Sequence, residues 1–375
     1  MYGSSIGKVL KITTWGESHG KGIGVVIDGC PAGLPISEQY IQTFLDRRKP
    51  GQTRYTTPRK ENDCVEILSG VFEGKTTGTP ISLVVHNESQ RSKDYSEIAN
   101  FYRPGHADYT FDAKYGFRDY RGGGRSSGRE TIGRVAAGAI ACALLETLHI
   151  SVTAYTKSIG PYTCHTDLLY PCHTLSDCIQ ARNESPLGMP DAEASLVAEQ
   201  YLASQMEQGD SAGGIIECVI SNVPAGLGDP VFDKLDANLA KAIFSIGAVK
   251  GFELGDGFAS AASTGTKNND SFYTENGITK KHTNHAGGIL GGISDGSDIV
   301  FRAAIKPTPS ISATQETINR SGETISVNIK GRHDPIIVPR AIVVVEAMAA
   351  LTVADALLAN MSAKIDYLKK VYTSS

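Results

Sequence analysis

The segment from Arg103 to Arg134 carries the densest set of residues that could do chemistry. It holds seven arginine and lysine residues against four aspartates and glutamates, a local charge of +3 in a chain of net charge −4. At its centre, GGGRSS at 122–127 runs directly into an Ala-rich stretch. Free backbone amides, two hydroxyls and a helix N-terminus can therefore converge on a phosphate or carboxylate. We expect an anion site here; the alternative is a solvated basic loop capped by Ser127.

Two histidines lie in glycine-flanked turns. His106 follows a Pro-Gly pair and stands among arginines, where a titratable ring could act as a proton donor near neutral pH. His19 follows Ser18 within the glycine-bounded run 16–20, and flanking glycines let a backbone approach a ligand closely. Plain turns with solvated histidines are the alternative. Ser18 is not expected to be a nucleophile, because the run lacks the GxSxG spacing.

Two segments nearer the C-terminus have similar features. Glycine pairs three residues apart in 284–292 suit the close approach of a flat ligand, and the lysine and hydroxyls of 306–310 suit its phosphate. Asp334, between His333 and Pro335 and near Arg340, could be a base, a hydrogen-bond orienter or a turn residue. For 284–292 and 306–310, two plain turns on either side of a strand are an equally good explanation.

Composition excludes several classes of protein. The 375 residues include 36 Lys and Arg against 40 Asp and Glu, so bulk charge would not bind nucleic acid or an anionic membrane. Seven cysteines form an odd set without a CxxC pair, which indicates reduced thiols and a cytoplasmic protein without an export signal. No metal is expected, because Cys164-His165 and Cys172-His173 lack the spacing of a zinc site.

The elements that must position these residues are short strands and a few long helices. Helices are predicted from Ser37, over 191–207 and from Asp229-Pro230. Two Ala-rich helices, at about 129–148 and 339–361, are apolar nearly all round and should be covered on more than one side. Strands are predicted at 8–13, 24–27, 64–68, 81–85, 215–221, 299–305 and 324–329. This pattern favours a layered α+β fold, and the lack of a linker favours one domain over 1–375.

Taken together, five motifs resemble those of the chorismate synthase family. They are GESHG at 16–20, RPGHADYT at 103–110, KYGFRDYRGGGRSS at 114–127, NHAGGILGGIS at 284–294 and GRHDP at 331–335. The resemblance runs in order over about residues 6–358. It implies a β-α-β sandwich, with long Ala-rich helices packed between antiparallel sheets, assembled as a homotetramer.

The same resemblance implies a phosphate lyase. In the last common step of the shikimate pathway, 5-enolpyruvylshikimate 3-phosphate would lose phosphate and a C6 hydrogen by 1,4-anti elimination, giving chorismate for aromatic amino acid biosynthesis. Reduced FMN would be required without net redox change. NADPH is a possible reductant, and a separate flavin reductase is a possible partner.

Roles for individual residues also follow from the resemblance. His19 would serve the departing phosphate, His106 the flavin N1 region and Asp334 the region near N5. Substrate or NADPH would be bound by Ser18, Arg48, Arg54, Arg103 and Arg129. The flavin would lie against Arg125, Ser126, Ser127, Gly247, Ala248, Gly291, Lys306, Pro307, Thr308, Pro309, Ser310 and Arg332. Three residues depart from the family pattern: Gly128, Gly247 and Pro309 stand where Ala, Asn and Ser are usual.

Two other functions match parts of the pattern. A phosphotransferase could use the GGGRSS loop for a nucleotide, although the GxxxxGK[ST] motif is missing, and it predicts dependence on ATP and magnesium. A single-strand RNA binder could use Arg121 and Arg125 with their aromatic neighbours, and it predicts affinity that falls steeply with salt.

Overall fold

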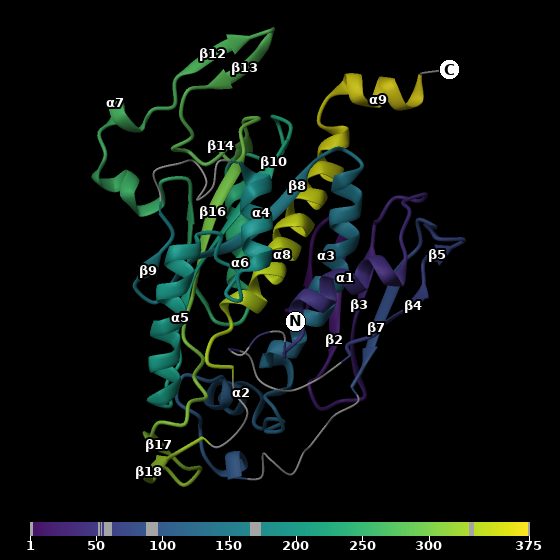
Figure 1. Ribbon diagram of the computed structural model, residues 1–375. Helices are drawn as coiled ribbons and strands as arrows, with labels where there is room; N and C mark the ends of the chain where they lie inside the picture. Colours follow the sequence, from purple (N-terminus) through teal and green to yellow (C-terminus); the bar gives the residue numbers. More distant parts are fainter. Residues whose placement is uncertain are drawn as a thin grey trace.

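The structure, a computed structural model, describes residues 3–51, 53, 55, 62–87, 97–165, 174–329 and 334–373. Its described strands form two five-stranded antiparallel sheets with a layer of helices between them (Figure 1). The first sheet has the order β1 (Ser5–Ile6), β2 (Lys11–Gly16), β3 (Gly22–Asp28), β7 (Ile81–His86), β4 (Val65–Ser69). The second has the order β11 (Val249–Leu254), β16 (Ile299–Ile305), β10 (Gly214–Ser221), β8 (Ser151–Ile159), β9 (Tyr162–Thr163). The predicted α+β sandwich is thus confirmed.

Two long helices form the centre of the sandwich. α3 (Thr131–Glu146) packs on the first sheet, α8 (Val338–Ala359) packs on the second, and the two helices pack on each other. Small residues allow this close approach, because a Cβ added at Gly138 of α3 would lie 2.5 Å from the Ala347 Cα of α8. α1 (Glu38–Arg48) and α6 (Leu235–Phe244) complete the layer beside them. Both Ala-rich helices are therefore covered on several sides, as predicted.

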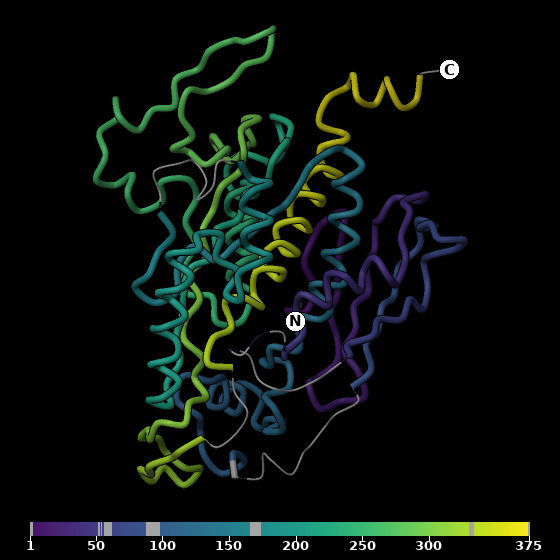
Figure 2. The backbone as a smooth tube through the Cα atoms, in the orientation of Figure 1, coloured from purple at the N-terminus to yellow at the C-terminus, as the bar shows by residue number. Residues whose placement is uncertain are grey.

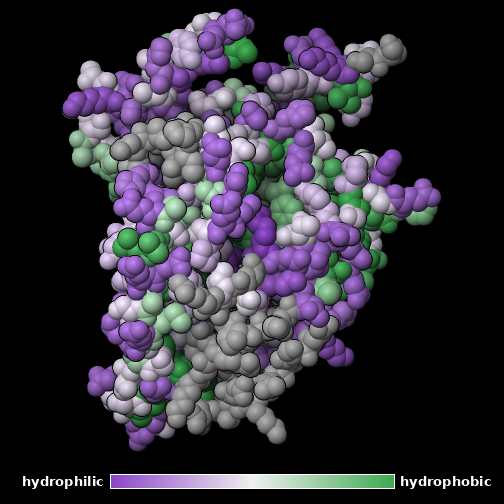
Figure 3. All heavy atoms as spheres, in the orientation of Figure 1, coloured by the Kyte–Doolittle hydropathy of each residue, from purple (hydrophilic) through white to green (hydrophobic). Residues whose placement is uncertain are grey.

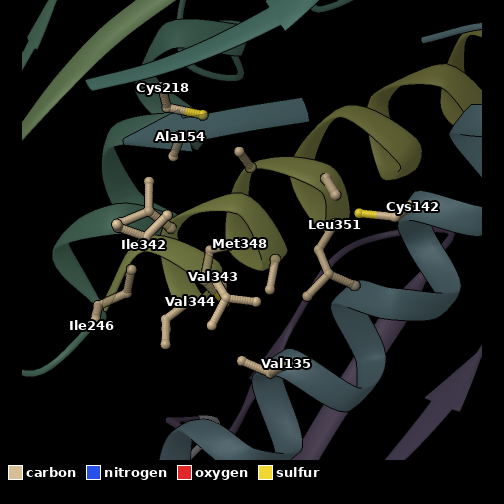
Figure 4. Close-up of a cluster of buried hydrophobic side chains, with 14 of the residues drawn as sticks. Val135, Cys142, Ala154, Cys218, Ile246, Ile342, Val343, Val344, Met348 and Leu351 are labelled. Carbon is tan, nitrogen blue, oxygen red and sulfur yellow. The ribbon is translucent and has the colours of Figure 1, made fainter. Parts of the chain in front are cut away.

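The core continues from α3 through α8 to the second sheet. Figure 4 shows Val135 and Cys142 of α3 facing Met348 and Leu351 of α8, with Cys218 of β10 beyond them. The helical stretch Val338–Ser362 is long and apolar enough to cross a membrane, but 72% of its most apolar window is buried inside the molecule. Its apolar character is thus explained by packing between two sheets.

One carboxylate interrupts this apolar helix. Glu346 is 3% exposed and pairs with Arg47 of α1 at 2.6 Å and with Arg182 at 2.8 Å. Its Oε1 also accepts a hydrogen bond from the Ala154 backbone N–H of β8 at 2.9 Å. The buried charge is therefore compensated. It ties α8 to α1, to β8 and to the helix α4 (Leu175–Glu184), which carries Arg182.

Smaller elements surround the sandwich. The remaining helices are α2 (Asp108–Tyr115), α4 (Leu175–Glu184), α5 (Ala192–Glu207), α7 (Gly265–Asn268) and α9 (Ile365–Tyr372). Four hairpins pair β5 (Val71–Phe72) with β6 (Lys75–Thr76), β12 (Phe272–Glu275) with β13 (Ile278–Lys281), β14 (Ile289–Leu290) with β15 (Ile293–Ser294), and β17 (Gln315–Ile318) with β18 (Thr324–Val327). The β12–β13 hairpin and α9 project from the same end of the body (Figure 1). On the face drawn in Figure 3, hydrophilic residues predominate and hydrophobic ones are scattered among them.

Two predictions about the elements were wrong. No helix begins at Asp229-Pro230: Val231 has a φ of +68°, and α6 begins at Leu235, whose N–H donates to the Gly292 carbonyl. The last predicted strand ends at Val327, two residues early. In addition, β8 and β11 were not predicted, although β8 is a long inner strand of its sheet.

Candidate functional site

One cavity of about 1340 Å³ opens where three helix ends meet. The C-terminus of α1 brings Arg48, the N-terminus of α3 brings the residues before Thr131, and the start of α8 brings Arg340. These segments, far apart in the sequence, converge near the N-terminal strand (Figure 2). Fourteen predicted site residues line the cavity: Arg48, Arg103, His106, Arg125, Ser126, Ser127, Arg129, Gly247, Ala248, Lys306, Thr308, Pro309, Ser310 and Asp334.

The lining is strongly cationic. Among the described residues it includes ten arginines and lysines but only two carboxylates, Glu130 and Asp334, a surplus of eight positive charges. The chain as a whole carries a net charge of −4, so this concentration is local. A cavity of this kind attracts a ligand with several negative charges.

The turn at 103–106 joins an arginine to a histidine. The His106 N–H donates to the Arg103 carbonyl at 3.2 Å, and Gly105 takes the φ of +67° that such a turn requires. Arg103 donates from Nε and Nη2 to the two oxygens of Asp108, each at 2.8 Å. Burial would raise the pKa of Asp108, but hydrogen bonds from Arg103 and His106 hold it well below its usual range. Asp108 is therefore ionised and fixes the guanidinium.

The three-glycine loop separates two histidines. A Cβ added at Gly122 would lie 2.5 Å from His19 Nδ1, and one at Gly123 would lie 3.1 Å from His106 Cε1. Both glycines have positive φ angles, +66° and +86°. The loop thus needs glycine both for its conformation and to leave room for the two rings. The Ser126 hydroxyl donates to the Gly123 carbonyl at 2.7 Å, which closes the loop on itself.

Arg125 holds the loop to the first sheet. Its guanidinium donates to the Gly16 carbonyl at 3.1 Å and to the Thr14 hydroxyl at 2.6 Å, and it lies 3.6 Å from Glu130. Ser127 caps the turn that follows, because its Oγ accepts from the Arg129 N–H at 3.3 Å. Arg125 lines the cavity, with much of its hydrogen bonding directed to the protein, and its contact with a flavin stays a prediction.

A buried carboxylate that the sequence analysis missed joins two of the predicted arginines. Asp63 forms a buried ion pair with Arg48, both side chains being 1% exposed, and lies 3.1 Å from Arg129 Nη2. Its φ of +47° is unusual for a residue other than glycine. Asn87 Oδ1 accepts from Arg129 Nε at 3.1 Å. The two arginines are thus set side by side by oxygen acceptors behind them.

The opposite wall is built by the chain that follows β16. Lys306 donates from Nζ to the Gly105 carbonyl at 2.6 Å, which ties this wall to the Arg103 turn. Burial, with a smaller effect of Lys250, lowers the pKa of Lys306. The Thr308 hydroxyl is buried without a hydrogen-bond partner among the described residues. A Cβ added at Gly247 would meet open space, so this wall leaves both room and an unused polar atom for a ligand.

Asp334 lies at the start of α8 and forms an ion pair with Arg340. Arg340 also donates from Nε to the Arg48 carbonyl at 3.0 Å. Burial lowers the pKa of Arg340, while the charge of Asp334 opposes that shift. Asp334 is therefore oriented from one side by a cation that also fixes the end of α1.

Of the remaining predicted residues, those that the structure describes do not line this cavity. Ser18 and His19 lie next to Gly122, and Ser18 Oγ is 3.2 Å from His19 Nδ1. Pro307 packs near Gly213, and Gly291 lies in the turn of the β14–β15 hairpin, outside the cavity lining. Arg54 and Arg332 lie outside the described residues, as do Cys172 and His173. The roles of all these residues stay predictions.

The 284–292 motif is held by a buried ionic network. Lys281 lies 3.2 Å from Asp270 and 2.8 Å from Asp295, and all three side chains are at most 7% exposed. Asp270 Oδ1 and Oδ2 also accept from the backbone N–H groups of His285 and Ala286. In this chain the motif therefore has an evident structural role as well as its predicted one.

This network predicts a loss of stability in acid. Burial opposes ionisation of Asp270, but hydrogen bonds led by that from Thr283 lower its pKa from 3.8 to about 2. The stabilisation is complete above pH 3.8 and is lost as the pH falls through about 2. It amounts to roughly 2 kcal/mol. Urea unfolding at a series of pH values should show a smaller acid loss in Asp270→Asn than in the natural chain; parallel curves would contradict this.

A second prediction concerns Gly128, which departs from the family pattern. It lies in the 3₁₀ turn Gly128–Glu130, its φ is not positive, and a Cβ added there would meet nothing within 4 Å. Gly128→Ala should raise the free energy of unfolding by about 0.4 to 1 kcal/mol, because alanine restricts the unfolded chain. The urea midpoint measures this, and an unchanged or lower midpoint would refute it.

Comparisons with known proteins agree on one family. The family model described as chorismate synthase matches residues 10–358. A chorismate synthase of Lachnoclostridium phytofermentans is 70% identical over 99% of this chain and 100% of the relative, and one of Methanosarcina mazei is 52% identical over 96% and 97%. A solved structure titled "Crystal Structure of Chorismate Synthase" superposes with a TM-score of 0.77 at 32% identity, covering 98% of this chain and 97% of that one.

Proposed function

The chain belongs to the chorismate synthase family, and from this premise we propose that the cationic cavity is its active site. The enzyme is a lyase that eliminates phosphate from 5-enolpyruvylshikimate 3-phosphate to give chorismate, with a flavin that undergoes no net redox change. The observation that best supports the location is the surplus of eight positive charges among the described lining residues. A substrate with a phosphate and two carboxylates requires such partners, since each desolvated anion must be paired.

The cavity wall formed by residues 247–250 and 306–310 fits a flavin mononucleotide. Lys250 and Lys306 offer cations for its phosphate, the buried Thr308 hydroxyl offers an unused hydrogen bond, and the space at Gly247 admits a flat ring. When bound, reduced FMN would supply the transient reducing power that the elimination needs, without net redox change. The residues of this wall hold and orient the group and exclude water around it.

The facing wall suits the substrate. Arg48 and Arg129, set by Asp63, and Arg103, set by Asp108, present fixed cations to its anionic groups. His19 lies beside Gly122 of the cavity lining, from where it would serve the departing phosphate. Asp334, oriented by Arg340, would assist on the flavin side.

Phosphate release under anaerobic conditions tests the activity. The full-length protein with dithionite-reduced FMN should release phosphate from 5-enolpyruvylshikimate 3-phosphate, and addition of ATP and magnesium should have no effect. Oxidised FMN without a reductant is the control and should give no turnover. Release that required ATP would instead support the phosphotransferase.

Affinity for FMN tests the location of the site. Thr308→Val is nearly isosteric and removes only the buried hydroxyl, so it should weaken FMN binding by about 1 kcal/mol, roughly fivefold. Fluorescence titration of the flavin measures this. An affinity equal to that of the natural chain would contradict the proposed contact.

We also propose a cytoplasmic homotetramer that uses FMN, supported by the cysteine pattern and the family resemblance. NADPH, or a separate flavin reductase, would supply the reduced flavin. Sedimentation of the purified protein tests the tetramer. Anaerobic NADPH oxidation by the protein alone tests whether a second protein is needed.

A further inference from the structure

We propose that Asn87 is a positioning residue, which fixes the loop that bears His19 relative to the guanidinium of Arg129. The inference rests on the proposed function, because it names a residue that holds two groups of that site in place. Asn87 is half-buried and lies outside the cavity lining. It acts on the site through the loop and the arginine that it holds.

The backbone of Asn87 is fixed by the first sheet. β7 ends at His86, which pairs with Gly22 at the start of β3. The next N–H, that of Asn87, donates to the Lys21 carbonyl at 3.1 Å and extends the pairing by one residue. Lys21 belongs to the loop that joins β2 to β3, and His19 lies at the centre of that loop. The Asn87 side chain therefore starts from a rigid point beside the loop.

The amide nitrogen of Asn87 holds both ends of a tight turn in this loop. The Glu17 carbonyl accepts from the Gly20 N–H at 3.0 Å, which makes Ser18 and His19 the two central residues of a β-turn. Asn87 Nδ2 donates to the Glu17 carbonyl at 3.0 Å and to the Gly20 carbonyl at 2.9 Å. Each hydrogen of the amide is thus used at one end of the turn. Because one planar group holds both ends, the position of His19 between them is fixed.

The oxygen of the same amide holds Arg129. Arg129 Nε donates to Asn87 Oδ1 at 3.1 Å. A guanidinium has only donors and a backbone carbonyl only accepts, so the amide oxygen must face Arg129 and the nitrogen must face the loop. Arg129 lines the cavity in the turn that precedes α3. One side chain therefore connects a loop of the first sheet with the substrate wall of the proposed site.

An amide suits this position because it holds Arg129 without cancelling its charge. Asp63 pairs with both Arg48 and Arg129, so these three groups together keep one positive charge for an anionic ligand. A carboxylate at position 87 would cancel that charge. It would also set its oxygens against the two loop carbonyls, acceptor against acceptor. Asparagine supplies two donors and one acceptor and adds no charge.

Two variants of Asn87 test the inference by the order of their effects. Asn87→Ala removes the donors and the acceptor, whereas Asn87→Asp keeps the shape but replaces the donors with a charge. Both should lower the kcat of phosphate release about tenfold or more, because both release the loop that bears His19. The KM for 5-enolpyruvylshikimate 3-phosphate should rise more in Asn87→Asp, because only the carboxylate cancels the charge of Arg129. A side chain that merely filled space would make the isosteric Asn87→Asp the milder variant. That order, or an unchanged kcat in both variants, would overturn the inference.

Hydrogen–deuterium exchange of the loop is a readout that needs no turnover. In the full-length protein, peptides that cover residues 16–22 should take up deuterium faster in both Asn87 variants than in the natural chain. Asn222→Asp is the matched control, because Asn222 Nδ2 also donates to a backbone carbonyl, that of His149 at 2.9 Å, outside the cavity lining. Its exchange at 16–22 and its kcat should match those of the natural chain.

Two results of the exchange experiment would overturn the inference: unchanged uptake at 16–22 in both Asn87 variants, or an equal increase in Asn222→Asp. Failure of the proposed function would be seen separately, as a natural chain that releases no phosphate. The exchange result would still decide whether Asn87 holds the loop.

Discussion

The Asp63→Ala variant is expected to lose about 3 to 5 kcal/mol of unfolding free energy and to bind substrate poorly. Arg48 and Asp63 are each 1% exposed, and removal of one partner leaves the other charge buried without compensation. Arg48 Nε already lacks a hydrogen-bond partner among the described residues, so little else is available to take over. The effect on substrate arises because Asp63 also sets Arg129, at 3.1 Å.

Urea unfolding and steady-state kinetics measure the two effects. Asp63→Asn separates charge from backbone conformation, because asparagine tolerates the φ of +47° and keeps an oxygen acceptor. It should lose less stability than the alanine variant but still raise the KM, since the two arginines are no longer neutralised from behind. An alanine variant as stable as the natural chain would show that Asp63 does not compensate Arg48.

The importance of Asp63 illustrates what the sequence could not reveal. Arg48 lies 15 residues before Asp63 in the chain, and Arg129 lies 66 residues after it. No motif or periodicity connects a loop carboxylate with such distant arginines. By contrast, the Pro-Gly turn before His106 and the three glycines before Arg125 are local signals with a direct conformational meaning, and both turns form. The predicted turns are therefore present, while the functional roles assigned to their residues stay predictions.

The same distinction applies to the fold. The two Ala-rich helices were predicted within a few residues because their composition determines burial on several sides. The start of α6 was missed, since a tertiary hydrogen bond from Leu235 to the Gly292 carbonyl and the positive φ of Val231 override the Asp-Pro signal. Gly291 does not line the cavity because its hairpin packs near α6, a contact that no local pattern encodes.

The second large effect is expected from Gly122→Ala, which should lower turnover about 100-fold or more while the fold persists. The added Cβ would lie 2.5 Å from His19 Nδ1 and 3.1 Å from Ser18 Oγ, so the imidazole must move. Displacement of a catalytic group by about 1 Å can cost a factor of this size. Because a side chain rather than backbone gives way, the stability cost should stay near the roughly 1 to 2 kcal/mol of the left-handed conformation.

Gly116→Ala is the matched control for Gly122→Ala. Gly116 has a comparable φ of +79°, lies outside the cavity lining, and an added Cβ there would meet nothing within 4 Å. It should show a similar loss of stability without the loss of turnover, as measured by urea unfolding and by phosphate release. Equal turnover in the two variants would mean that the position of His19 does not matter to the reaction. A large loss of turnover that occurs only in Gly122→Ala would instead support a catalytic role for the His19 ring, which lies against Gly122.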